Sequence, residues 1–350
     1  MFLNKNQQII AIIVLKNQNI QSSAIHNKIL KSGGDISLIT VKRVLSDLAR
    51  AGILIANGSG RSTNYNISTK GRLFLNIDAH EYCSIEPDKR YGSSSYNFDF
   101  FSSLPTNIFF ENELKILEQA TDRYQERTKD LSEAIQKKEL ERIVIELSWK
   151  SSKIEGNTYT LLDTENLLLD NKEAVGKTKQ ETQMILNHKD AFDFIRKNKD
   201  RFKNITKRNL EDLHKILVKN LNVELGLRKK QVGVTGSIYR PLDNIYQVDE
   251  AVEALSKAVE RLKTPYDKAL MVLAGIGYIQ PFEDGNKRSG RLMANAILLA
   301  YGCAPLSYRS IDENEYREAM LVFYELNSIA PLKKIFIEQY DFAAKNYLVK

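Results

Sequence analysis

Residues 277–291 read Gly-Tyr-Ile-Gln-Pro-Phe-Glu-Asp-Gly-Asn-Lys-Arg-Ser-Gly-Arg, and this stretch decides how the chain is interpreted. The stretch is flanked by two apolar runs. Residues 269–278 lead into it and are almost wholly apolar, and residues 292–300 follow it and are also mainly apolar. Runs of this length and composition are typical of buried helices. The sequence therefore predicts two core helices joined by a polar loop.

The loop combines an anion-binding geometry with a hard oxygen ligand. Gly285 and Asn286 lead into the second helix, where free backbone N–H groups and the positive end of the helix dipole favour an anion. Arg288 and Arg291 are three residues apart, so they share a helix face and can bind one polyphosphate. Asp284 is the kind of ligand that Mg²⁺ takes together with phosphate oxygens. These residues predict a magnesium-nucleotide site; the alternative is a solvated charged turn between helices.

The same residues resemble the signature of Fic-domain proteins, His-x-Phe-x-Asp/Glu-Gly-Asn-Gly/Lys-Arg-x-x-Arg. The matching positions are Phe282, Asp284, Gly285, Asn286, Lys287, Arg288 and Arg291. The first position differs, because Gln280 stands where the family has its catalytic histidine.

A second motif lies at the end of a predicted helix covering about residues 132–157. Ser151, Glu155 and Gly156 resemble the inhibitory motif of the same family, Ser/Thr-x-x-x-Glu-Gly/Asn. Without the resemblance, the same residues are consistent with an ordinary helix C-terminus, since Gly and Asn commonly end helices. The resemblance implies that Glu155 pairs with Arg291 and competes with the γ-phosphate of the nucleotide for the same guanidinium.

The resemblance implies transfer of AMP from ATP to a Ser, Thr or Tyr hydroxyl of a target protein or of the chain itself. Asp284 would hold Mg²⁺, while the backbone N–H groups of Gly285, Asn286 and Lys287, the Asn286 side chain and Arg288 would stabilise charge on the α-phosphate. Arg291 would orient the γ-phosphate. In the family the histidine removes the proton of the target hydroxyl, and a carboxamide cannot, so Gln280 predicts a rate loss of about 10²–10⁴.

Two other functions stay open. A catalytically dead chain would act as a nucleotide-sensing regulator, which Gln280 favours. The Doc-type relatives transfer the γ-phosphate and have Lys at the position of Lys287, but they lack the last arginine, which this chain keeps as Arg291. AMP transfer is therefore favoured over phosphorylation.

Composition points to an ordinary globular protein of more than one domain. The chain has 350 residues, of which 43% are hydrophobic and 27% charged. These proportions are usual for soluble proteins, and no apolar run reaches membrane-spanning length. Only two cysteines, Cys83 and Cys303, are present, and the N-terminus lacks the pattern of an export signal, so we expect a cytoplasmic protein with no membrane anchor. The four histidines have no metal-ligand spacing and are expected to be structural.

The N-terminal residues 1–75 carry the excess positive charge. They hold ten Lys or Arg against two Asp, a net charge of +8, while the whole chain has +7. The pattern predicts three short helices, at residues 4–16, 22–32 and 37–51, and then a β-hairpin, which resembles a winged helix-turn-helix. That fold places its third helix in the DNA major groove, and it also serves as a protein-docking module. The candidate DNA contacts are Lys42, Arg43, Arg50 and Arg61.

The fold expected overall is mainly α: a Fic-type helical bundle with a small β-hairpin flap, preceded by an α/β winged-helix domain. The domains expected are residues 1–75, a connector at 76–110, and the Fic domain at 111–350. Alternation in residues 230–241 predicts the flap, in which Val234, Thr235, Gly236 and Tyr239 would dock the target segment by strand addition. The resemblance to the family also makes a homodimer one expected assembly.

Overall fold

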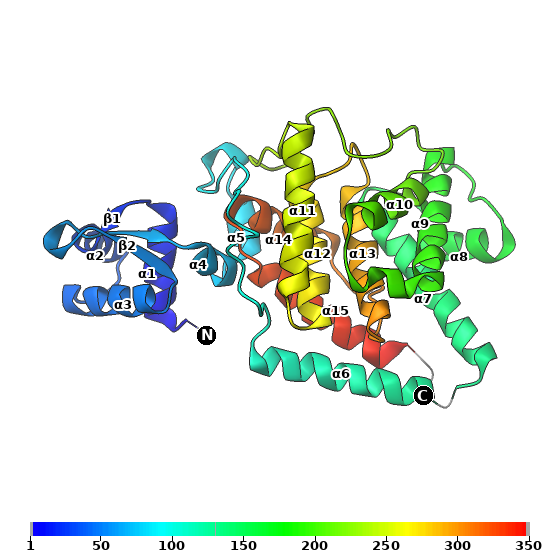
Figure 1. The fold of residues 1–350 in the computed structure, drawn as a ribbon, viewed down its shortest axis with the longest axis horizontal. Coiled ribbons are helices and arrows are strands. Elements are labelled where there is room, and N and C mark those ends of the chain that lie inside the picture. The colour runs from blue at the N-terminus through cyan, green and yellow to red at the C-terminus, as the bar shows by residue number, and fades with distance from the viewer. Residues whose placement is uncertain (1–2, 130, 348–350) are drawn as a thin grey trace. The chain divides into compact units, whose positions relative to one another are not determined.

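The computed structural model describes residues 3–129 and 131–347, and they form two compact units. The first unit combines Met1–Pro105 with two later segments, Val234–Tyr239 and Leu321–Pro331. The second unit holds Thr106–Gly233, Arg240–Met320 and Leu332–Lys350. The two units are described separately, and the labels of their elements are those of Figure 1.

The first unit begins with three helices and a small sheet. The helices are α1 (Lys5–Lys16), α2 (Ser22–Lys31) and α3 (Leu38–Arg50), and the strands are β1 (Ile20–Gln21), β2 (Leu54–Asn57) and β3 (Asn64–Ile67). The sheet is antiparallel with the order β1-β3-β2, and Leu54 faces Ile67 across the hairpin. The three helices and the hairpin that the sequence predicts are present; the short β1 was not expected.

Local capping explains where two of these helices begin. Asn4 and Gln7 form a reciprocal capping box at the start of α1, and Ser37 accepts a hydrogen bond from the Thr40 N–H at the start of α3. Ser22 is the first helical residue of α2, and Gln21 precedes it without a side-chain cap bond. One face of each helix is buried in a shared core that includes Ile10, Val14, Ile25, Val41, Leu45 and Leu48.

The remainder of the first unit is more structured than a plain connector. It contains α4 (Thr69–Phe74), α5 (Ala79–Ser84) and the single turn η2 (Pro87–Lys89). The buried carboxylate of Glu325 accepts hydrogen bonds from Tyr82 (2.6 Å), Arg90 (3.1 Å) and Ser237 (2.7 Å). This carboxylate joins three segments of the unit that are far apart in the sequence.

The β-hairpin expected at residues 230–241 is not formed, so this prediction is wrong. The segment has no strand; it makes a turn in which the Ser237 N–H donates to the Val234 carbonyl. Side chains bind its backbone where a neighbouring strand would, because Arg90 donates to the Gly236 carbonyl at 2.9 Å. Gly236 has a φ of 77°, which no extended strand adopts.

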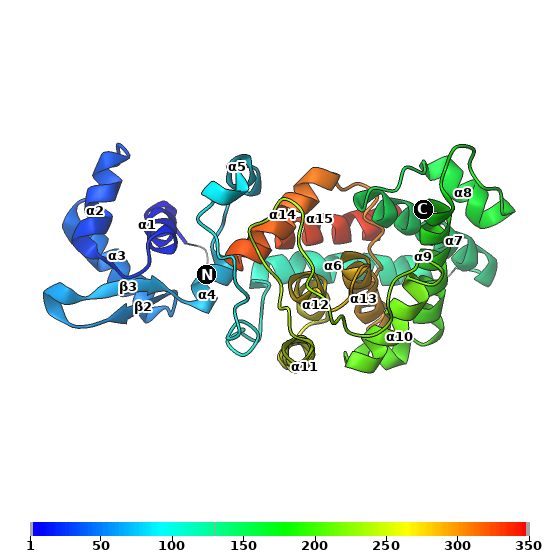
Figure 2. The ribbon, with the colours of Figure 1, turned by 90° about the horizontal axis from the view of Figure 1, so that it is seen from above.

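The second unit is built from helices. Their bounds are α6 (Glu111–Lys129), α7 (Glu133–Ile154), α8 (Leu161–Asp170), α9 (Lys179–Lys197), η3 (Lys199–Lys203), α10 (Lys207–Leu217), α11 (Ile245–Arg261), α12 (Pro265–Ile279), α13 (Asn286–Ala300), α14 (Glu313–Leu326) and α15 (Ala330–Asn346). The last residues of α14 and the first two of α15 fall in the segment Leu321–Pro331 of the first unit. The helices α12 and α13 lie side by side in both views, with α11 against α12 (Figures 1 and 2). They are the two core helices that the sequence predicts.

Capping boxes set the start of two further helices. The helix α9 begins at Lys179, where Thr178 and Glu181 form a capping box. The preceding α8 begins with its own capping box, Thr160 and Asp163. In the described part of the chain, no helix combines the length and the apolar character needed to cross a membrane.

Candidate functional site

The loop between α12 and α13 begins at Gln280, which the sequence motif predicts to stand in place of a catalytic histidine. Gln280 ends α12 in the left-handed region, with φ 52° and ψ 60°, and is 7% exposed. Its side-chain N–H donates to the Gly277 carbonyl at 2.6 Å, and its backbone carbonyl accepts from Arg228 Nε at 2.6 Å. The side chain therefore caps the end of α12, and Arg228 fixes the backbone after it.

The loop is closed by Asn286. The Phe282 N–H donates to Asn286 Oδ1 and Asn286 Nδ2 donates to the Phe282 carbonyl, both at 2.8 Å. Gly285, between them, has a φ of 83° and serves as the N-cap of α13. The first N–H groups of α13 have no helical acceptor, and they are the anion-binding groups expected from the sequence. The Asn286 side chain is occupied in holding the loop.

His214 supports the loop from α10. Its ring stacks on Phe282, with centroids 3.7 Å apart and planes 7° from parallel. Nε2–H donates to the Asp284 carbonyl at 2.9 Å, because a carbonyl can only accept. Burial lowers the pKa of His214 to about 4, so the ring is neutral near pH 7. Its Nδ1 is buried and has no partner among the described residues, so it does not reach a substrate as a substitute base.

Asp284 and Arg288 form the outer part of the site. Arg288 Nη2 lies 2.8 Å from Asp284 Oδ2; the arginine side chain is 2% exposed and the carboxylate 64%. Nη1 of Arg288 is buried with no partner within the described chain. A buried guanidinium N–H without an acceptor, next to an exposed carboxylate, suits a phosphate that carries a magnesium ion.

The residues expected to form an inhibitory motif contact the same helix. Arg291 is fully buried, and its Nη2 donates to Glu155 Oε1 at 2.8 Å. Lys287 Nζ lies 3.7 Å from the other carboxylate oxygen. Ser151 accepts from Arg291 twice, through its hydroxyl at 2.8 Å and its carbonyl at 2.9 Å. We call these four residues the Glu155 cluster.

The electrostatics of the Glu155 cluster favour the charged pair. Burial alone would raise the pKa of Glu155, but Arg291 and Lys287 outweigh burial and hold it below its ordinary value. Burial would lower the pKa of Arg291, and the carboxylate of Glu155 raises it instead. Glu155 therefore stays ionised at neutral pH. It stands at the C-cap of α7, and Gly156, with φ 96°, ends the helix.

His188 extends the cluster inward. Its Nε2 lies 2.7 Å from the Ser151 hydroxyl. Since the Arg291 Nε–H can only donate, the serine oxygen accepts from it, and the same hydroxyl contacts His188. Burial first, and then the charges of Arg291 and Arg288, lower the pKa of His188 well below its ordinary value. The imidazole is therefore neutral near pH 7.

The donor set contains one carboxylate for a metal. Within the described residues, no group of three or more His, Cys, Asp or Glu side chains could hold a metal ion. Asp284 alone fits Mg²⁺ of the kind that is bound mainly through nucleotide phosphates and water.

The remaining candidate residues lie in the first unit. The turn Val234, Thr235, Gly236 belongs to it, and the buried Tyr239 ring lies 6.0 Å from that of Tyr324. The docking role of this turn stays a prediction.

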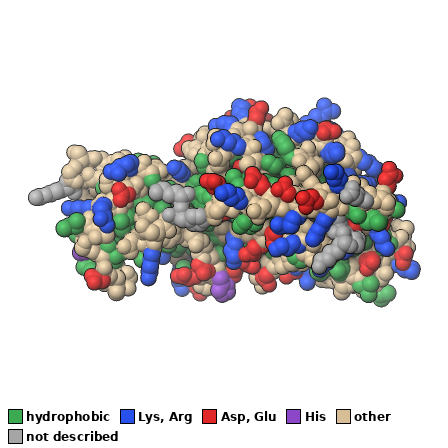
Figure 3. Space-filling view, turned by 90° about the horizontal axis from the view of Figure 1, so that it is seen from below, with side chains coloured by type: hydrophobic (Ala, Val, Ile, Leu, Met, Phe, Trp, Pro, Cys, Tyr) green, Lys and Arg blue, Asp and Glu red, His purple; other side chains and the backbone are tan. Residues whose placement is uncertain are grey.

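The candidate DNA contacts fall mainly on α3. Lys42 and Arg43 are exposed there, Arg50 lies 3.6 Å from Asp47, and the side chain of Arg61 is outside the described residues. On the face shown in Figure 3, basic and acidic side chains are interspersed.

Sequence reasoning missed His188, His214 and the contact of Lys287 with Glu155. The two histidines were expected to be structural, which agrees with their burial and hydrogen bonds. No signal in the sequence pointed to their partners, because each partner is on another helix or loop.

Comparison with known proteins shows which family this helical protein is similar to. Residues 204–298 match the model of the Fic/DOC family. Two curated relatives named "Protein adenylyltransferase Fic" are similar: that of Nematostella vectensis is 29% identical over 175 residues, and that of Culex quinquefasciatus 30% identical over 178 residues. Each alignment covers 49% of this chain, but only 41% and 35% of the respective relative, so the chain spans about two fifths of their length.

Solved structures agree on the fold. Fic-1 (residues 134–508) from C. elegans has a TM-score of 0.56 at 19% identity, over 67% of this chain and 71% of that one. A Fic-domain-containing signalling protein from Bacteroides thetaiotaomicron has a TM-score of 0.53 at 21% identity, over 66% of this chain and 96% of that one. The mainly helical architecture is thus the Fic fold. Residues 204–298 are thus similar to the Fic/DOC family, and the named relatives are protein adenylyltransferases.

Proposed function

We propose that the chain is a protein AMP-transferase that uses ATP and Mg²⁺, restrained by Glu155 and weakened by Gln280. The observation that carries the proposal is the contact of Glu155 Oε1 with Arg291 Nη2 at 2.8 Å, beside a loop built as the Fic signature requires. This contact is the pairing that a carboxylate acting against the γ-phosphate would make.

Each group has a proposed role in binding ATP. The N–H groups at the start of α13 and the buried Arg288 would hold the α- and β-phosphates, and Asp284 would hold Mg²⁺. Arg291 would bind the γ-phosphate once Glu155 leaves it. A bound magnesium would neutralise phosphate charge.

The missing group is the base. The Gln280 side-chain amide already donates to the Gly277 carbonyl, and a carboxamide takes up no proton near neutral pH. The neutral His214 holds the loop by its backbone and has its second nitrogen buried. Transfer to a Ser, Thr or Tyr hydroxyl of a target, or of the chain itself, should therefore be slow.

The test is label transfer from α-³²P-ATP to protein, in lysate and to the chain itself. We would compare the chain with Gln280→His, each with and without Glu155→Gly, and use Glu155→Gln as the control of similar size. The form with histidine and without glutamate should label protein about 10²–10⁴-fold faster than the form with glutamine and without glutamate. Parallel reactions with γ-³²P-ATP separate AMP transfer from the phosphotransfer of the Doc-type relatives.

Two outcomes would contradict AMP transfer. Label from the γ-phosphate alone would identify a phosphotransferase. No label from any folded, ATP-binding form would favour the second candidate, a nucleotide-sensing regulator without catalysis, which is suggested by the use of Gln280 as a helix cap.

We further propose that residues 1–75 bind DNA. The support is their net charge of +8 and the exposed Lys42 and Arg43 on α3. Affinity for duplex DNA should fall steeply between 50 and 200 mM salt, because phosphate contacts release counterions. Binding that is independent of salt would indicate a protein-docking role instead.

A further inference from the structure

The last turn of α7 is held by α14. Carbonyl groups in the last turn of a helix have no partner within the helix. The carbonyl of Ile154, the residue before Glu155, accepts hydrogen bonds from Arg317, from Nε at 3.2 Å and also from Nη2. Arg317 therefore satisfies this carbonyl and places positive charge at the negative end of the helix dipole.

A second side chain of α14 binds the same turn through charge. Glu313 Oε1 lies 2.6 Å from Lys150 Nζ and 3.4 Å from Lys153 Nζ. The hydrogen bond from Lys150 is the main cause that lowers the pKa of Glu313. Since Lys150 is 5% exposed, this pair is mostly shielded from water. Glu313 and Arg317 are four residues apart, so they lie on one face of α14, and both bind the end of α7.

The same helix also supports the other partner of the ion pair. The Arg291 guanidinium carbon lies 5.6 Å from the centre of the Tyr316 ring, which is 1% exposed. The helix α14 thus touches Arg291 through Tyr316, and touches the residue next to Glu155 through Arg317. The carboxylate and the guanidinium are both positioned from one element.

We propose that Arg317 is a positioning residue for Glu155. By fixing the Ile154 carbonyl it sets where Glu155 leaves the helix, and so how strongly the carboxylate competes with a nucleotide for Arg291. The inference rests on the proposed inhibitory role of Glu155. It identifies a residue outside both sequence motifs that would influence the inhibition by Glu155.

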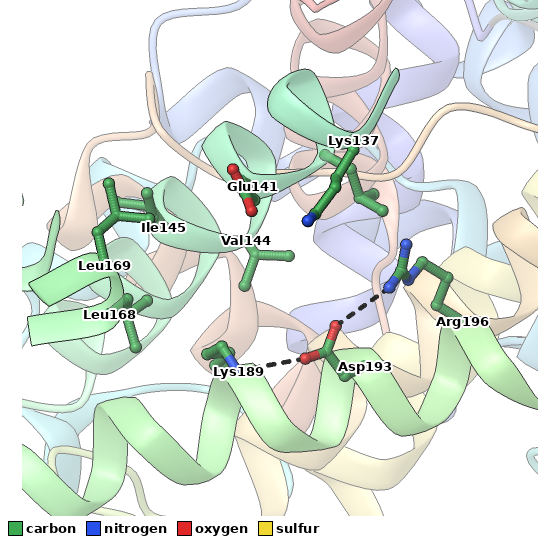
Figure 4. A pocket seen from close by; sticks show the side chains of 10 residues that line it. Lys137, Glu141, Val144, Ile145, Leu168, Leu169, Lys189, Asp193 and Arg196 are labelled. Atoms are coloured by element: carbon green, nitrogen blue, oxygen red, sulfur yellow. Dashed lines mark hydrogen bonds and ion pairs between the residues drawn. The ribbon is translucent and has the colours of Figure 1, made fainter. Parts of the chain in front are cut away.

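A groove elsewhere along α7 takes no part in positioning Glu155. It is a cavity of about 220 Å³ between α7, α8 and α9 (Figure 4). Val144 and Leu168 line it, and Asp193 in its wall pairs with Lys189 at 3.4 Å and Arg196 at 3.7 Å. It contacts the first part of α7 and no motif residue. Arg196 therefore offers a matched control: an arginine in an ion pair on the same unit, remote from Glu155 in its contacts.

The test is a double-mutant cycle on the affinity for Mg·ATP, measured by calorimetry on the full chain. The variants are Arg317→Gln, Glu155→Gly and both together, with Arg196→Gln as the control. Arg317→Gln should tighten the Kd by about three- to tenfold, as expected when hydrogen bonds that favour the competing carboxylate are lost. In the Glu155→Gly background, Arg317→Gln should leave the Kd unchanged. The control Arg196→Gln should leave the Kd unchanged both with and without Glu155. Arg317→Lys, which keeps the charge and one donor, should lie in between.

The outcomes separate the two proposals. If Glu155→Gly tightens Mg·ATP binding and Arg317→Gln does not, the inhibitory role stands and the positioning role of Arg317 is wrong. An equal effect of Arg317→Gln in both backgrounds also overturns it, since Arg317 would then act on the fold or the nucleotide directly. If Glu155→Gly itself changes nothing, the proposed inhibition is wrong and this inference falls with it.

Discussion

Replacing Ser151 with alanine should destabilise the helical unit far more than the same change one residue later. The Ser151 hydroxyl is fully buried and joins two other buried groups, Arg291 Nε at 2.8 Å and His188 Nε2 at 2.7 Å. Ser152 is equally buried on the same helix, but its hydroxyl has no partner among the described residues. The two substitutions remove the same atom from neighbouring positions.

The expected magnitude follows from what each alanine leaves behind. Ser151→Ala leaves a charged N–H and an imidazole nitrogen buried without partners, at about 1.5–3 and 1–3 kcal/mol. Allowing for relaxation, we expect a loss of about 3–5 kcal/mol in the free energy of unfolding. Ser152→Ala removes an unpaired hydroxyl and improves helix propensity, so its effect should lie within about 0.5 kcal/mol of zero.

The assay is urea denaturation followed by tryptophan fluorescence. The chain has a single tryptophan, Trp149, two residues before Ser151 on α7. Its indole N–H donates to the Tyr159 carbonyl at 3.1 Å, so its emission reports the loss of structure around α7 itself. Equal slopes against urea for all three proteins would show that the midpoints can be compared.

A difference of less than about 1 kcal/mol between the two alanine variants would refute this reasoning, because two buried partners should cost more than that. Such a result would mean that Arg291 and His188 find other partners when the hydroxyl is removed. The chain of bonds from Glu155 to His188 would then contribute little to stability.

Two further predictions concern the loop after α12. Because burial lowers the pKa of His214 to about 4, the unfolded chain takes up this proton first, and stability should fall as pH drops from 6.5 towards 4 by about 1.4 kcal/mol per unit. Between pH 6.5 and 5.0, His214→Gln should therefore lose about 1.5 kcal/mol less than the unchanged chain in urea titrations; equal losses would contradict this. Asn286→Ala should leave the N–H and carbonyl of Phe282 unpaired, lower the unfolding free energy by about 2–4 kcal/mol and weaken Mg·ATP binding, whereas an unchanged Kd would show that the loop holds its shape without this side chain.

The core of the fold could be predicted because its signals are local. The capping box of Thr264 and Asp267, with Pro265 at the first helical position, sets the start of α12, and Gly285 sets the start of α13. The apolar runs around the loop could only be buried. The contact of Glu155 with Arg291 was expected from the paired motifs, and the two side chains do meet at 2.8 Å.

The partners of the site could not be predicted, because they are distant in sequence. Ser151 and His188 are 37 residues apart, His214 and Asp284 are 70 apart, and Ile154 and Arg317 are 163 apart. Periodicity says which face of a helix is buried, but not which helix covers that face. Arg317 in particular reads as one more charged residue on an amphipathic helix.

The hairpin that was expected but is not formed shows a second limit of prediction from sequence. Residues 230–241 were expected to alternate as a strand does, yet a strand needs a neighbour, and Arg90 and Glu325 bind Gly236 and Ile238 instead. Alternation records which side chains face inward, and an ordered loop held by side chains can produce the same pattern.

The left-handed backbone at Gln280 has a consequence for how this position can change over generations. At φ 52° and ψ 60°, branched residues such as Val, Ile and Thr are strained, whereas His, Asn, Asp and Gly are tolerated. The backbone therefore restricts drift at this position to a few residue types, and histidine is among them. Replacing Gln280 with histidine should thus require no rearrangement of the backbone.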